Sequence, residues 1–192
     1  MGTGGGGRWA AALALTMAAL AASAAASTSA AGDAAAADDD IAALAARRLL
    51  LPVDGVAPPS LRDTFNEKRD AGARPHEAQD IMAPRGARVL AVDDGRLVRL
   101  FTSKPGGLTV YQFDPSGRYA YYYAHLDRYA DGVKEGMPLA RGDLIGYVGV
   151  SGNSAPDAPH LHFAIFRLGP EKQWWKGTPV NPYRLLNPAA GR

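Results

Sequence analysis

The stretch "ARVLAVDDGRLVRLF" (residues 87–101) places two short apolar runs on either side of Asp93-Asp94-Gly95. Val, Leu and Phe suit strands, and an Asp-Gly pair between two apolar runs is a turn signal. The stretch therefore predicts two β-strands around a turn.

Further runs of the same kind follow towards the C-terminus. They are "LTVYQFD" (108–114), "YAYYYAHL" (119–126), "GDLIGYVG" (142–149) and "HLHFAIFRL" (160–168), and Gly, Pro and Asp separate them. Short strands at this spacing favour an antiparallel sheet over a βαβ arrangement. We therefore expect a mainly β fold, a single antiparallel β-sheet or barrel-like domain over residues 51–187.

The N-terminus differs from this pattern. Residues 1–31 carry one positive charge, Arg8, then an Ala-rich apolar run from Trp9 to about Ala22 and small-residue A-x-A-like sites. The run is short of the ~20 residues that a spanning helix needs, so it predicts a cleaved secretory signal peptide rather than a membrane anchor. We expect an extracytoplasmic protein, periplasmic or secreted, without a stable membrane span after cleavage.

Residues 32–50 are expected to form a linker or a short helix. In "DIAALAARRLL" (40–50), Asp40 is placed as the N-cap of such a helix and Pro52 as the residue that ends it.

Composition narrows the chemistry that the chain can perform. The 192 residues carry a net charge of +2 without a Lys/Arg cluster, so nothing favours a nucleic-acid partner. The absence of cysteine excludes disulfides, thiolate metal ligands and a cysteine nucleophile. Any metal ion must therefore be held by His, Asp or Glu.

The four histidines all lie in the strand-rich part of the chain. In "HLHFAIF" (160–166) the strand period of two places His160 and His162 on one face, and Leu161 and Phe163 on the other. A single histidine there would fit a hydrogen-bonded core residue, whereas two on one face indicate a shared site.

Two further places carry the remaining histidines. His76 and Asp80 are four residues apart, which brings their side chains to one side of the chain, and imidazole and carboxylate are zinc ligands. Alone, this spacing is better explained by an exposed histidine with an ordinary surface aspartate. His125 ends the tyrosine-rich strand "YAYYYAHL", where it can reach a cleft. Trp174 and Trp175 in "EKQWWKGT" (171–178) are interpreted as packed or exposed aromatics rather than groove residues.

Together, H-x-x-x-D, "YYAHL" and "PHLHF" resemble the LytM- and lysostaphin-like zinc metallopeptidases, peptidase family M23, of the murein endopeptidase type. The resemblance covers roughly Leu51 to Leu186, including "IMAPRGARVLAVDDGRL" and "EGMPLARGDLIGYVGVSGN". It implies a substrate groove over the sheet and a Zn²⁺ cofactor. The implied metal ligands are His76, Asp80 and His162, and the implied catalytic pair is His125 and His160.

The activity implied by this resemblance is hydrolysis of peptide cross-links in bacterial peptidoglycan. A zinc held by two imidazoles and one carboxylate can lower the pKa of bound water from ~15.7 towards ~7, and the activated water would attack the scissile amide. His125 and His160 could serve as base, acid or electrostatic stabiliser. The alternatives are a non-catalytic activator of a cell-wall amidase, a zinc peptidase with another peptide substrate, and a secreted β-domain with incidental histidines. Protein partners are not indicated.

Overall fold

The computed structural model describes residues 35–69, 72, 74–187 and 189. The signal peptide expected over residues 1–31 lies outside the described residues. The chain divides into two units between Asp39 and Asp40, and the named strands all belong to the second unit, Asp40–Arg192.

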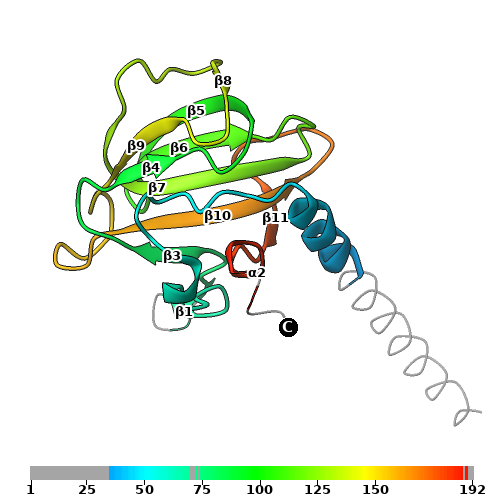
Figure 1. The fold of residues 1–192 in the computed structure, drawn as a ribbon, viewed down its shortest axis with the longest axis horizontal. Coiled ribbons are helices and arrows are strands. Elements are labelled where there is room, and N and C mark those ends of the chain that lie inside the picture. The colour runs from blue at the N-terminus through cyan, green and yellow to red at the C-terminus, as the bar shows by residue number, and fades with distance from the viewer. Residues whose placement is uncertain (1–34, 70–71, 73, 188, 190–192) are drawn as a thin grey trace, which may run out of the picture. The chain divides into compact units, whose positions relative to one another are not determined.

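A nine-stranded antiparallel sheet dominates this unit (Figure 1). The strands are β3 (Gln79–Met82), β4 (Arg88–Leu90), β5 (Gly95–Ser103), β6 (Gly107–Phe113), β7 (Tyr119–Tyr129), β8 (Pro138–Leu139), β9 (Leu144–Val148), β10 (His160–Leu168) and β11 (Gly177–Val180). The main order is β11-β10-β7-β6-β5-β8, while β3 pairs with β10, and β9 pairs with both β4 and β7. The predicted mainly β, antiparallel fold is therefore confirmed.

Smaller elements surround the sheet. A two-stranded hairpin, β1 (Lys68–Arg69) with β2 (Arg74–Pro75), precedes β3, and η1 (Pro58–Ser60) and α2 (Tyr183–Leu186) are short helices. Among the described residues, none of the helices combines the length and apolar character needed to cross a bilayer.

Residues 87–101 do not form a simple hairpin. β4 and β5 form on either side of Asp93-Asp94-Gly95, yet β4 pairs with β9, and β5 pairs with β6 and β8. The reason is that Asp93 is buried, with Tyr121 Oη donating a hydrogen bond to its carboxylate. The segment is thus anchored in the core instead of forming an exposed turn.

The helix near the N-terminus corrects one expectation. Residues 35–46 are helical, so Asp40 lies inside the helix and is not its N-cap, and the helix ends well before Pro52. The Asp40 side chain is buried and accepts hydrogen bonds from Tyr119 Oη and Arg118 Nη2, both at 2.9 Å. Because these partners come from distant sequence, tertiary pairing decided the role of this carboxylate.

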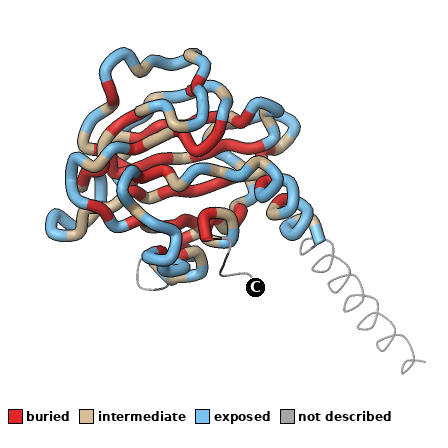
Figure 2. Tube along the Cα trace, in the orientation of Figure 1, coloured by how far each residue is buried: buried red, intermediate tan, exposed pale blue. Residues whose placement is uncertain are grey.

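Buried residues gather along the strands of the sheet (Figure 2), and the apolar side chains of β10 belong to this core. Leu161, Phe163 and Ile165 are all fully buried, as the period-two pattern predicted. Burying each such side chain contributes about 1.5–3 kcal/mol relative to exposure. His160 and His162 face the other way and are half-buried. The core therefore fixes the direction in which the two imidazoles point.

Candidate metal centre and groove

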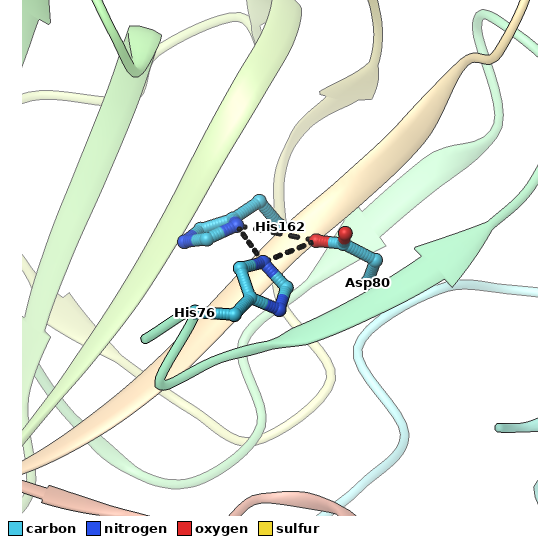
Figure 3. Close-up of side chains that lie close together, drawn as sticks. All are labelled: His76, Asp80 and His162. Atoms are coloured by element: carbon cyan, nitrogen blue, oxygen red, sulfur yellow. Dashed lines mark hydrogen bonds and ion pairs between the residues drawn. The ribbon is translucent and has the colours of Figure 1, made fainter. Parts of the chain in front are cut away.

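Three predicted ligands meet where β3 and β10 pair (Figure 3). His162 on β10 is the direct cross-strand partner of Asp80 on β3, and His76 lies in the segment between β2 and β3. His76 Nε2 lies 3.0 Å from His162 Nδ1 and 3.1 Å from Asp80 Oδ1, and the last two atoms are 3.2 Å apart. Two nitrogens and one oxygen thus form a nearly equilateral triangle.

This triangle fits a zinc ion. Zn–N and Zn–O bonds of roughly 2.0 Å at tetrahedral angles separate neighbouring ligand atoms by about 3.3 Å. The tautomer of His76 also fits, because its Nδ1 lies 2.9 Å from the carbonyl oxygen of Thr64, which can only accept. Nδ1 therefore carries the proton, and Nε2 offers a lone pair to the centre of the triangle.

The protonation states suit metal binding as well. Burial alone would raise the pKa of Asp80, but hydrogen bonds with His162 and His76 hold that pKa well below its usual range. Burial lowers the pKa of His162, although Asp80 opposes the change. At neutral pH the site thus presents a carboxylate and a neutral imidazole, which are the ligand forms that bind a metal.

Thr64 orders the Asp80 end of the site. Its Oγ1 accepts a hydrogen bond from the Asp80 backbone N–H (2.9 Å) and donates one to the carbonyl of Ala78 (3.1 Å). Glu77 has a φ of +57°, which turns the chain sharply between His76 and β3. Thr64 was missed at the sequence level, because a lone threonine far upstream carries no pattern that marks it.

The two predicted catalytic histidines lie beside the triangle. The His125 ring is centred 5.0 Å from that of His160 and 5.6 Å from that of His162. His125 Nδ1 donates to the carbonyl of Ser151, and His160 Nδ1 donates to that of Ala158, both at 2.8 Å. Each ring therefore has its Nδ1 proton engaged and its Nε2 available as an acceptor.

An irregularity in β7 directs His125 towards this site. The β6–β7 register shifts between Leu108 and Val110, and the β7–β9 register shifts between Leu126 and Arg128. At this point His125 has a φ of +61°, and its backbone N–H donates to the carbonyl of Gly106 (2.8 Å). Bulges of this kind re-aim side chains next to functional sites.

A groove of about 840 Å³ contains all five predicted site residues. Tyr122, Ala164 and Phe166 line it along β7 and β10, and Lys104 and Arg74 contribute cationic side chains. Burial lowers the pKa of His125 to about 4, although its hydrogen bond with Ser151 opposes the shift. His125 is therefore neutral at physiological pH.

Comparison with known protein families identifies the class to which this chain belongs. The pattern of peptidase family M23 matches residues 74–182, more than half of the chain, so the chain belongs to this family. The resemblance seen in the sequence is confirmed.

Individual relatives add detail. The chain is 32% identical over 121 residues to an L-Ala–D-Glu endopeptidase of Bacillus subtilis (strain 168), covering 60% of this chain and 37% of that relative. The catalytic domain of lysostaphin from Staphylococcus simulans superposes with a TM-score of 0.55 at 25% identity, covering 67% of this chain and 94% of that domain. A zinc-containing peptidase from Vibrio cholerae has a TM-score of 0.54 at 26% identity, covering 71% of this chain and 39% of that one. The chain thus spans well under two thirds of the Bacillus relative.

Proposed function

We propose that this protein is a zinc-dependent endopeptidase that hydrolyses peptide cross-links of bacterial peptidoglycan outside the cytoplasm. The observation that carries the proposal is the triangle of His76, Asp80 and His162, with His125 and His160 beside it in one groove. A surface cluster with no function would not need four histidines from three separate segments in one place.

The ligand assignment rests on the geometry of the triangle: His76 Nε2, Asp80 Oδ1 and His162 Nδ1 would hold the zinc ion. A zinc ion held by these residues would act as a Lewis acid, polarising the scissile carbonyl and lowering the pKa of its bound water towards ~7. The groove, lined by Tyr122 of β7 and by Ala164 and Phe166 of β10, would hold an extended peptide over this position.

The two remaining histidines handle protons. Because His125 and His160 both have Nδ1–H bonded to a backbone carbonyl, their neutral rings offer only Nε2, as an acceptor. Each ring can donate from Nε2 only after it has taken a proton. Proton uptake from the attacking water and delivery to the leaving amine therefore fit this pair.

The substrate class rests on the family and the named relatives. A relative from Vibrio cholerae is named a peptidoglycan DD-endopeptidase, which supports the cross-link as the substrate. The Bacillus relative is named for cutting an L-Ala–D-Glu bond, which supports a peptidoglycan peptide more broadly, and the Vibrio structure is described as a peptidase that contains zinc. A cell-wall substrate also accords with the signal peptide expected over residues 1–31, which would direct the chain out of the cytoplasm.

The test is digestion of purified peptidoglycan by the zinc-loaded protein, with the fragments identified by mass spectrometry. We expect about one zinc per chain by elemental analysis and new amino termini at the cross-link. His162→Ala should lose most of the zinc, whereas His125→Ala should keep it and lose activity by about 10²–10⁴-fold.

The fragments separate the competing activities. New termini between L-Ala and D-Glu would overturn the cross-link assignment in favour of stem-peptide cleavage. Release of intact stem peptides from the glycan would show an amidase. No cleavage by the zinc-loaded protein would contradict the enzyme proposal and favour an activator of another hydrolase. Full zinc content in His162→Ala would contradict the ligand set.

A further inference from the structure

The two carboxylate oxygens of Asp80 have different partners. Oδ1 faces His76 and His162 in the ligand triangle. Oδ2 points away and accepts a hydrogen bond from Arg69 Nη2 at 2.6 Å. A charge-assisted bond of this length is among the stronger hydrogen bonds in proteins. The carboxylate is therefore held on one side, while its other side faces the metal position.

Arg69 is itself well held. It lies in β1 opposite Arg74 of β2, so the hairpin places it next to the chain that leads into His76. Its Nη1 lies 3.2 Å from Glu67 Oε2, and the carbonyl of Glu67 accepts a hydrogen bond from the His76 backbone N–H at 2.9 Å. The same short segment thus positions both a ligand and the guanidinium.

Arg69 does not compete for the ligand atom of His76. Its Nη2 lies 3.2 Å from both ring nitrogens of His76. The in-plane lone pair of Nε2 points away from Nδ1, so an atom equidistant from both nitrogens cannot lie along it. The guanidinium therefore contacts the ring while Nε2 stays directed at His162 and Asp80.

We propose that Arg69 is a positioning residue for the metal: it holds Oδ2 of Asp80 so that this carboxylate binds through Oδ1 alone. The inference rests on the ligand set of the proposed function. Groups that orient metal ligands in this way typically contribute 10–100-fold to metal affinity. Lys in place of Arg supplies the charge but not the planar fork, so it should restore the effect only in part.

The experiment measures zinc affinity by chelator competition in the wild type, Arg69→Met and Arg69→Lys. We expect affinity to fall about 10–100-fold in Arg69→Met and by less in Arg69→Lys. The Co²⁺-substituted Arg69→Met protein should also show an altered visible absorption spectrum, because the second carboxylate oxygen becomes free to bind. A residue with a merely structural role would leave that spectrum unchanged.

Arg62→Met is the matched control. Arg62 Nη2 also pairs with Glu67, at 2.7 Å, but the Arg62 side chain is 80% exposed. It contacts Oε1 of that carboxylate, whereas Arg69 contacts Oε2. It should leave zinc affinity unchanged. Affinity and Co²⁺ spectrum both equal to wild type in Arg69→Met would overturn the inference while leaving the proposed function intact. A wild type that binds no zinc would overturn both. If Arg69→Met does not fold, the Arg69→Lys affinity decides, and a wild-type value overturns the inference.

Discussion

His125 combines a positive φ of +61° with a side chain that is largely buried, the residue being only 6% exposed. A non-glycine residue in this conformation costs of order 1–3 kcal/mol, which the surrounding structure must offset. Bonds from its backbone N–H to Gly106 and from its Nδ1 to Ser151 do so. The strain therefore coincides with the place where the imidazole enters the groove.

Burial of His125 predicts a pH effect on the metal-free protein. Its folded pKa is about 4, below the ordinary 6.5, so the unfolded chain takes up the proton first as the pH falls. The stability associated with the neutral ring is complete above pH 6.5 and is lost between about 6.5 and 4. Urea unfolding from pH 7 to about pH 4.5 should therefore show a shallower loss in His125→Gln than in the wild type. Equal slopes would contradict this assignment.

Four of the five residues predicted for the site are histidines, a type that is rare in this chain, and all five lie together in the structure. The four histidines and Asp80 all line one groove, as their residue types and order had indicated. Their separate roles stay predictions until variants are measured. Thr64 and Arg69 were not predicted. Thr64 bonds to the Asp80 backbone and Arg69, placed by a hairpin, bonds to the Asp80 carboxylate, and no local sequence pattern indicates either contact.

At the scale of elements, strand existence followed from sequence but pairing did not. Apolar runs and turn residues located β4 and β5, yet the two strands pair with different partners. Asp93 made the difference, because its buried carboxylate also pairs with Arg47, far upstream. Long-range polar contacts of this kind override a local turn signal.

The segment between β10 and β11 offers a test at the same scale. The Trp174 ring packs against Tyr111 (4.7 Å between centroids) and Phe101 (5.4 Å), whereas Trp175 is 60% exposed. Both fit the interpretation as packed or exposed aromatics. Trp174→Ala should lower the free energy of unfolding by about 1–3 kcal/mol, since the side chain is half-buried. Trp175→Ala should stay within about 0.5 kcal/mol. Equal urea midpoints for the two variants would contradict the packing role.

Across the whole molecule, the hydroxyl groups of three tyrosines on β7 bond to buried polar side chains from other segments. Burial raises the pKa of Tyr121 and Tyr123 far above the ordinary value, and it raises the pKa of Tyr119 to about 12. Tyr121 Oη donates to Asp93, Tyr123 Oη donates to Gln112, and Tyr119 Oη donates to Asp40. Each hydroxyl must keep its proton for these bonds to persist.

The molecule should therefore lose stability in alkali. Because the folded pKa values lie above the unfolded value of 10, the stabilisation is complete below pH 10 and is lost as the pH rises beyond it. Urea unfolding should show a falling midpoint from about pH 9 to about pH 11, and Tyr121→Phe should reduce the slope. A midpoint that is flat over this range would contradict the prediction.

The register of β10 carries a hazard for folding. His160 and His162 are two residues apart, and side chains on a strand alternate with a period of two. A two-residue slip would keep apolar side chains in the core and exchange one histidine for the other beside Asp80. Burial of apolar side chains alone does not distinguish this shifted register from the observed one. In the observed register the Gly149 backbone forms an isolated bridge to His160, at the first residue of β10. The bridge thus belongs to the register in which His162, and not His160, is paired with Asp80.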